Sequence, residues 1–393
     1  MQLVQVPVTL GQLPDWPATV QYAVRAAPAT VARSWLRRVC RLTTSFLPRR
    51  FVFMGSSRTI LGDRRYGINV IGNAATGLGH VYRQLGIALH LNAKPVFFVP
   101  EGHDLALAKI REHHYPVSVY QSEAELVRRI AGEKIGLVIN DVLDTERQLI
   151  EAIKLIGAKV VNFEDLGSGS HAAHLTINDL YEFSKDSANI RYGHEYVCLR
   201  PDVNFSAKKV IGSDVRTILI ACGGVDPANL THRYLTALGS LGFRDKVRVV
   251  LGLGYRRTVE LKEAHRASGL AVEYFENVPI MADFILGADL VLSSNGRTVY
   301  EAVAIGTPTI VMCQNAQEAR HTFSNISGAV TNLGLGTEVA DTAIREAIRR
   351  HIDDFEHRKR MNERMLSFRL EEGIHRVLAL IERVARTPHE KLA

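Results

Sequence analysis

Short apolar runs alternate with amphipathic segments from Tyr66 onward. In the first half of the chain, apolar runs occur at 68–72, 96–99, 116–120, 136–139 and 159–163. Segments with helical periodicity separate them, at 81–92, 104–113, 122–132 and 145–156. Continuous apolar strands that alternate with helices are typical of a parallel sheet covered by helices on both faces.

The same alternation starts again after a stretch rich in Tyr, His and Arg at 191–202. Further strands are predicted at 216–221, 247–253, 271–275, 290–294 and 309–313, and further helices at 228–239, 256–267, 280–287, 297–305 and 316–326. Composition and charge pairing predict packing helices from Thr342 to Arg386. The pattern therefore predicts an α/β fold of two tandem doubly wound, Rossmann-like domains, 66–207 and 208–393. A ligand is expected in the cleft between them, at the carboxyl ends of the strands.

Positive charge is concentrated before this pattern begins. Residues 1–65 carry ten arginines and two aspartates, whereas the net charge of the whole chain is +7. The body of the chain therefore has no basic character with which to bind nucleic acid. Within 30–53, Val31, Trp35 and Val39 recur at helical spacing beside arginines, which predicts a basic amphipathic helix able to lie on an anionic membrane surface. A helix docked on the first domain, or a leader without function, explains the pattern as well.

Composition limits the class of protein further. With 46% hydrophobic and 23% charged residues, the chain resembles ordinary globular proteins, and no apolar run reaches the roughly 18–20 residues of a membrane-spanning helix. The four cysteines are scattered and lack zinc-ligand spacing, so we expect reduced thiols. No secretory signal is recognised, and a cytoplasmic location is expected.

The first candidate site is the stretch ATGLGHVYR at 75–83, where a strand passes into a helix. Glycines at such a turn let the backbone approach a ligand, and the helix start offers free N–H groups. A dinucleotide fingerprint is excluded because Tyr82 occupies the position of the third glycine, and no GK[ST] follows for a Walker loop. His80 is thus presented at the mouth of the cleft, although a lone histidine is often structural.

The second half contains two comparable turns. In ACGGVDPANLT (221–231), Gly223 and Gly224 follow a strand, which suits a diphosphate held by backbone N–H groups, although a plain tight turn explains the pattern equally. In SSNGRTVYEAVAIGTPTIV (293–311), Gly296 turns the chain and Glu301 lies in the next helix. A carboxylate there can accept both hydroxyls of a ribose, while a surface glutamate is the simpler alternative.

Four blocks together resemble a known family: GLGHVYR, FEDLGSG (163–169), CGGVDPANLT and SSNGRTVYEAVAIGTPTIVMCQN. In this order and spacing they resemble the UDP-sugar hydrolases of pseudaminic acid biosynthesis and the related spore-coat polysaccharide proteins. They look more distantly like the lipid II-forming N-acetylglucosaminyltransferase, of the GT-B fold. The resemblance covers roughly residues 66–330.

The resemblance implies a division of roles along the chain. His80 matches the histidine that activates water for attack at the anomeric carbon. The nucleotide would contact a second group, namely Gly223, Gly224, Asp226, Asn277, Val278, Asn295, Gly296 and Glu301, with Asn277 and Val278 near the uracil. The sugar would contact a third, namely Gly77, Gly79, Arg83, Glu164, Asp165 and Asn315. No cofactor and no metal are implied, because helix N-termini can stabilise the leaving diphosphate.

The expected activity is hydrolysis of a UDP-sugar, releasing a free amino or deoxy sugar for nonulosonic acid or surface polysaccharide biosynthesis. A histidine with a reference pKa of about 6.5 suits a general base near neutral pH. Arg83, three residues after His80, could hold a phosphate or a sugar substituent, or form a surface ion pair. After the fourth strand, however, Asn140 to Asp144 replace the aromatic and polar cluster of those hydrolases. A glycosyltransferase that uses the same donor with an acceptor hydroxyl therefore remains the alternative, and the sequence gives no oligomeric state.

Overall fold

The computed structural model describes residues 65–91, 93–182 and 187–387. These residues all belong to one compact unit, 59–393. The basic segment 1–65 lies outside the described residues except for Arg65, so its amphipathic helix and membrane contact stay predictions. No helix within the described ranges has both the length and the apolarity needed to cross a membrane.

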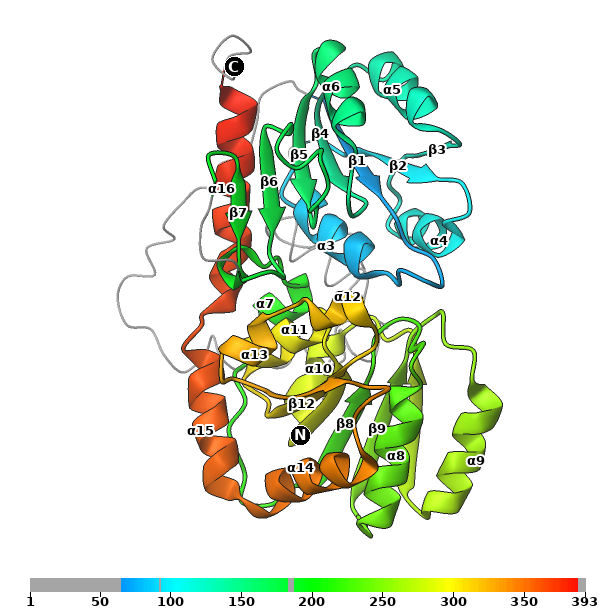
Figure 1. The fold of residues 1–393 in the computed structure, drawn as a ribbon, viewed down its shortest axis with the longest axis vertical. Coiled ribbons are helices and arrows are strands. Elements are labelled where there is room, and N and C mark those ends of the chain that lie inside the picture. Colours follow the sequence, from blue (N-terminus) through cyan, green and yellow to red (C-terminus); the bar gives the residue numbers. More distant parts are fainter. Residues whose placement is uncertain (1–64, 92, 183–186, 388–393) are drawn as a thin grey trace, which may run out of the picture. The chain divides into compact units, whose positions relative to one another are not determined.

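The first sheet contains seven parallel strands in the order β3-β2-β1-β4-β5-β6-β7 (Figure 1). Their bounds are Arg65–Val70 (β1), Val96–Pro100 (β2), Val117–Tyr120 (β3), Ile135–Asp141 (β4), Lys159–Phe163 (β5), Leu175–Asn178 (β6) and Ile190–Tyr192 (β7). The helices between the first five strands are α3 (Gly79–Ala88), α4 (Asp104–Glu112), α5 (Glu123–Gly132) and α6 (Arg147–Leu155). A short 3-10 helix, His194–Tyr196, and α7 (Pro201–Asn204) follow β7.

The second sheet contains six parallel strands in the order β10-β9-β8-β11-β12-β13. Their bounds are Thr217–Ala221 (β8), Lys246–Leu251 (β9), Ala271–Glu276 (β10), Leu290–Ser294 (β11), Thr309–Cys313 (β12) and Thr331–Leu335 (β13). The helices that connect them are α8 (Leu230–Ser240), α9 (Thr258–Ser268), α10 (Met281–Gly287), α11 (Thr298–Ile305), α12 (Ala316–Ala319) and α13 (Phe323–Ile326). The structure confirms all ten predicted strands and adds β6, β7 and β13.

Both sheets reverse their strand order at one place, between β1 and β4 in the first and between β8 and β11 in the second. The chain leaves neighbouring strands in opposite directions there, which opens a crevice at the carboxyl ends of the strands. Asp141 ends β4 and Ser294 ends β11, so both lie beside a crevice of this kind.

The C-terminal helices divide between the two sheets. Helix α14 (Asp341–Asp353) packs on α8, and α15 (Phe355–Leu366) packs on α11. After a 3-10 turn at Leu370–Glu372, α16 (Gly373–Arg386) contacts β5 and β6 of the first sheet. Ile374, Val377 and Ile381 of α16 belong to the core that covers the first sheet. This differs from the expectation that 208–393 pack together, because the amphipathic α16 buries its apolar face on the first sheet. The boundary near residue 208 stays a prediction.

A buried lysine joins α16 to the first sheet. Lys159 of β5 is fully buried, and its Nζ lies 2.7 Å from the carbonyl oxygen of Val384 and 3.1 Å from that of Ala385. Carbonyls in the last turn of a helix have no partner within the helix and carry partial negative charge. The ammonium group therefore satisfies the C-terminus of α16.

Candidate active site

A cleft of about 310 Å³ opens at the two crevices and is lined by residues from both sheets. Gly77, with φ of +70°, and Gly223, with φ of +84°, make the turns that border it. A Cβ added to Gly224 would lie 3.5 Å from the Cα of Gly77. The glycine turns of the two sheets thus face each other closely, as expected where backbone must approach a ligand.

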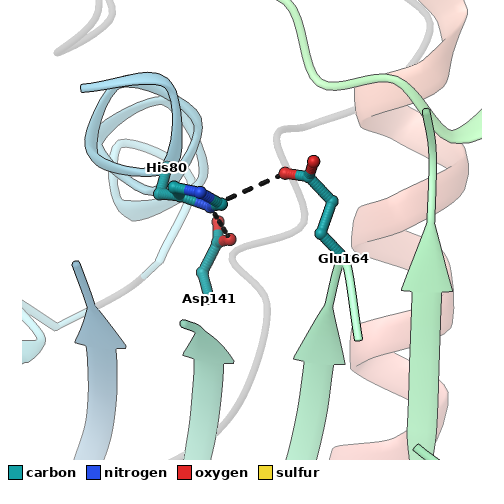
Figure 2. Close-up of side chains that lie close together, drawn as sticks. All are labelled: His80, Asp141 and Glu164. Carbon is teal, nitrogen blue, oxygen red and sulfur yellow. Dashed lines mark hydrogen bonds and ion pairs between the residues drawn. The ribbon is translucent and has the colours of Figure 1, made fainter. Parts of the chain in front are cut away.

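His80 lies in the first turn of α3, directly after β1, and its side chain is 9% exposed. Its Nδ1 lies 2.7 Å from Oδ1 of Asp141, which ends the neighbouring strand β4 (Figure 2). Burial would raise the pKa of Asp141, but the charges of Arg83 and His80 hold this pKa well below its usual range. Because an ionised carboxylate only accepts hydrogen bonds, Nδ1 of His80 donates. The ring's Nε2 makes no hydrogen bond to any residue of the described ranges and is left as an acceptor.

Arg83 is enclosed by three carboxylates. Its Nε donates to Oδ2 of Asp141 at 2.7 Å, its Nη1 donates to Oδ1 of Asp179 at 2.8 Å, and its Nη2 also bonds to Glu164. The side chain is completely buried. Arg83 also lines the cleft, but three carboxylates already occupy its guanidinium, so the expected contact with a phosphate or sugar substituent stays a prediction. Arg83 holds Asp141 in place.

The two acids after β5 have different surroundings. Glu164 has a φ of +50° and lines the cleft. Its Oε2 lies 3.6 Å from Nδ1 of His80. Asp165 is fully buried and accepts hydrogen bonds from Thr145 Oγ1 at 2.6 Å and from the amide of Gly167 at 2.8 Å. The structure brings Glu164 to the expected position, whereas Asp165 stabilises the turn and does not line the cleft.

His80, Asp141 and Glu164 also form a group whose potential ligand atoms all lie within 4.8 Å of one another. Imidazole and carboxylate donors can coordinate a metal ion. Here, however, Arg83 already donates hydrogen bonds to both carboxylates. A metal ion would have to compete with a guanidinium for the same oxygens, so the donor set fits a metal poorly.

On the second sheet, the glycine turn after β8 presents free backbone donors. Neither the amide of Gly223 nor that of Gly224 hydrogen-bonds to another group of the described residues. Asp226, two residues on, accepts from the amides of Leu230 at 2.8 Å and Thr231 at 2.9 Å through its two carboxylate oxygens. The side chain of Asp226 therefore caps α8, and the residue also lines the cleft, so its expected contact with the nucleotide stays a prediction.

The turn before α11 presents Gly296 to the cleft and turns the side chain of Asn295 away from it. Asn295 donates through Nδ2 to the carbonyl oxygens of Glu318 at 2.8 Å and His321 at 3.0 Å. It holds the segment between α12 and α13 in place, which corrects its assignment to the nucleotide. Asn315 lines the cleft and also caps α12, accepting from the amide of Glu318 at 2.9 Å.

Glu301 lies in α11 with its carboxyl group at the cleft and an exposed fraction of 8%. Burial raises its pKa to about 7, against the opposing charges of Arg200 and Arg297. No side chain of the described residues hydrogen-bonds to it. Asn277 and Val278, in the loop after β10, line the same cleft.

Several site residues were not identified from the sequence. Asp141 could have been found, because an acid at the end of an apolar strand run, beside a strand-order reversal, is a signal. Asp179 follows a strand too short to predict. Glu318, whose pKa burial raises to about 7, lies in a segment with no pattern that marks it. Arg297 directly follows Gly296 in the candidate turn at 293–311, so its position was a signal.

Comparisons with known proteins support the fold. No family model matches the chain. An uncharacterized protein of Methanocaldococcus jannaschii is 27% identical over 62% of the chain, and the chain spans about half of that protein, 54%. The spore coat polysaccharide biosynthesis protein SpsG of Bacillus subtilis is 27% identical over 80% of the chain and 97% of its own length.

Solved structures are similar at lower identity. MurG of Acinetobacter baumannii matches with a TM-score of 0.60 and 14% identity, over 81% of this chain and 99% of its own. The spinosyn forosaminyltransferase SpnP matches with a TM-score of 0.59 and 10% identity, over 82% of this chain and 100% of its own. A UDP-GlcNAc 2-epimerase of Neisseria meningitidis, bound to UDP-GlcNAc, matches with a TM-score of 0.52 and 13% identity, over 81% of this chain and 100% of its own. The chain has the GT-B-like fold of these enzymes.

Proposed function

We propose that the chain is a nucleotide-sugar hydrolase, with a UDP-sugar as its substrate and His80 as the general base. The observation that carries this proposal is the 2.7 Å hydrogen bond between Nδ1 of His80 and the buried, ionised Asp141. A buried carboxylate that holds one ring nitrogen leaves the other nitrogen as the base, which is the arrangement of hydrolytic triads. Asp141 is the positioning residue, and Arg83 keeps it in place.

In the proposed reaction a water molecule attacks the anomeric carbon, C1. The water oxygen forms a bond to C1, its proton passes to Nε2 of His80, and the bond between C1 and the diphosphate oxygen breaks with its electron pair on the diphosphate. The imidazolium that results lies against the carboxylate of Asp141, which offsets its charge. A single displacement of this kind inverts the configuration at C1.

The second sheet would hold the nucleotide. The free amides of Gly223 and Gly224, and the start of α11 at Gly296, can donate hydrogen bonds to the charge that develops on the diphosphate. Glu301 would accept the ribose hydroxyls, and Asn277 and Val278 would lie near the uracil. This assignment needs no metal and no cofactor.

Two comparisons support the biological setting. The bacterial relative is named for polysaccharide biosynthesis, and one protein of this fold is bound to UDP-GlcNAc. We therefore propose that a free amino or deoxy sugar is released for nonulosonic acid or surface polysaccharide biosynthesis. A glycosyltransferase is the second candidate, because SpnP shares the fold and is named a transferase.

One experiment separates these functions. The protein is incubated with UDP-GlcNAc and a panel of other sugar nucleotides, without an acceptor, and free nucleoside diphosphate is measured. Catalytic release that disappears in His80→Asn supports the hydrolase. Release only after an acceptor is added supports the transferase, and no release under either condition contradicts both.

A further inference from the structure

Arg297 lies where α11 begins, and its side chain lines the cleft. The methylene groups of this side chain pack against the turn that carries His80, since a Cβ added to Gly79 would lie 3.3 Å from its Cδ. Arg297 comes from the second sheet's crevice and touches the first sheet's crevice. It therefore stands at the junction of the two parts of the cleft.

Arg297 and Glu301 are four residues apart, so they lie on the same face of α11 about one turn, or 5.4 Å, from each other. The positive charge of Arg297 acts on two acids of the cleft, Glu301 and Glu164. Burial raises the pKa of Glu301, and Arg200 and then Arg297 oppose this effect. Burial also raises the pKa of Glu164, and the charges of Arg83, His80 and Arg297 lower it. Along the cleft the order is thus Glu301, Arg297 and then the site of His80.

The guanidinium of Arg297 is held in place but not saturated. Its Nη1 donates to Oδ2 of Asp179 at 3.1 Å, and its Nη2 donates to the carbonyl oxygen of Cys198 at 2.8 Å. A guanidinium has five N–H donors, so three remain. The side chain is 17% exposed, and Asp179 divides its charge between Arg297 and the buried Arg83.

The other two arginines of the cleft are placed differently. Arg83 has no exposed surface and bonds to three carboxylates. Arg200 bonds to Asp202 and to the carbonyl oxygen of Pro279, and acts on Glu301. Arg200 makes two hydrogen bonds, as Arg297 does, but among the described residues that line the cleft Arg297 is the arginine with free donors that also contacts the turn at Gly79 and acts on Glu164.

We propose that Arg297 binds the diphosphate of the nucleotide substrate. This inference rests on the proposed function, in which ribose at Glu301 and sugar at His80 are joined by a diphosphate. A guanidinium recognises phosphate oxygens through charged, directional hydrogen bonds. The bonds to Asp179 and Cys198 fix its position before the ligand arrives, so less side-chain entropy is lost on binding.

The test is calorimetric titration of the full chain with UDP and with uridine. We expect Arg297→Met to weaken UDP binding ten- to a hundredfold, the size of losing charged hydrogen bonds, and to leave uridine binding unchanged. Arg297→Lys keeps the charge and should fall between wild type and Arg297→Met. Arg320→Met is the matched control, because Arg320 is an exposed arginine that does not line the cleft, and it should bind UDP like wild type.

Uridine affinity also reports whether each variant keeps its nucleoside pocket. If Arg297→Met binds UDP as wild type does, the inference is wrong while the proposed function stands. If Arg297→Met loses UDP and uridine affinity equally but Arg297→Lys retains both, the residue is structural and the inference is also wrong. If the wild-type protein binds neither UDP nor dTDP, GDP, ADP or CDP, the proposed function and the inference both fall.

Discussion

His80 and Asp141 are 61 residues apart in the chain, yet a 2.7 Å hydrogen bond joins Nδ1 of the one to Oδ1 of the other. The topology explains this contact. β1 and β4 are neighbouring parallel strands, with Val70 paired to Asp141. Helix α3 leaves the end of β1, so its first turn lies over the end of β4. The strand-order reversal places His80 beside the carboxylate of Asp141.

Removing the proposed base, His80, should abolish most of the activity. His80→Asn keeps a polar side chain of similar size but has no proton-accepting nitrogen. We expect turnover to fall at least a hundredfold, within the range that general base catalysis contributes, while UDP affinity changes less than twofold. Steady-state kinetics and UDP titration measure the two effects. His171→Asn is a suitable control, since His171 is exposed and does not line the cleft. Turnover of His80→Asn within a few-fold of wild type would rule out this role.

Asp141→Asn tests the positioning residue. The amide can present either an oxygen or an NH₂ group to His80, so the ring is no longer held in one tautomer. Turnover should fall at least tenfold and up to about 10⁴-fold, the loss known for this change in a serine protease triad. KM should change little, because Asp141 is fully buried behind His80. Glu123→Gln, which removes an exposed carboxylate, should leave turnover unchanged. A loss of UDP affinity as large as the loss of turnover would show that Asp141 only supports the fold.

The sequence predicted the sheets well because buried strands are continuous apolar runs, and β1, β4 and β8 each follow this pattern. It also predicted which turns line the cleft, at Gly77 and Gly223. It did not predict how polar side chains use their hydrogen-bonding groups. The sequence predicts a ligand contact for Arg83, Asp165, Asp226 and Asn295. In the structure these side chains bond to residues of the protein itself.

The physical reason is that a strand end near a crevice buries some polar groups and leaves others at the surface. Buried polar groups must find partners, and those partners come from distant parts of the chain. Arg83 meets Asp179, 96 residues away. The strand before Asp179 is too short to predict from the sequence, so only the folded chain shows that the two groups neutralise each other.

Lys159 should contribute to stability through α16. Lys159→Met keeps most of the volume of the side chain but leaves the carbonyl groups of Val384 and Ala385 without their donor. We expect the free energy of unfolding to fall by about 2–3 kcal/mol, as for the loss of charged hydrogen bonds in a buried site. Urea denaturation followed by circular dichroism measures this change. Lys262→Met, at an exposed position of α9, should change the free energy by less than about 0.5 kcal/mol. Equal stability of the two variants would contradict the prediction.

Glu301 should make nucleoside binding depend on pH. Burial raises the pKa of its carboxyl group to about 7, so the free protein carries a protonated Glu301 below this pH and an ionised one above it. The ionised group can accept a hydrogen bond from each ribose hydroxyl with its two oxygens, whereas protonation turns one of these oxygens into a donor and weakens the pair of bonds. Affinity should therefore rise with pH, by roughly tenfold between pH 6 and pH 8, because about a tenth of the groups are ionised at pH 6.

Uridine is the ligand of choice for this measurement, because it carries no phosphate that titrates in the same window. Glu301→Gln should bind uridine more weakly at pH 8 and should lose the pH dependence. At pH 8, 2′-deoxyuridine should bind the wild-type protein more weakly than uridine does. At pH 6 this difference in affinity should be smaller. Burial also raises the pKa of Glu318 to about 7, so Glu318→Gln is the matched control. In this variant the affinity for uridine should still rise with pH as it does in the wild-type protein. If the pH dependence of uridine affinity persists in Glu301→Gln but is lost in Glu318→Gln, the titrating group is Glu318, and Glu301 does not bind the ribose.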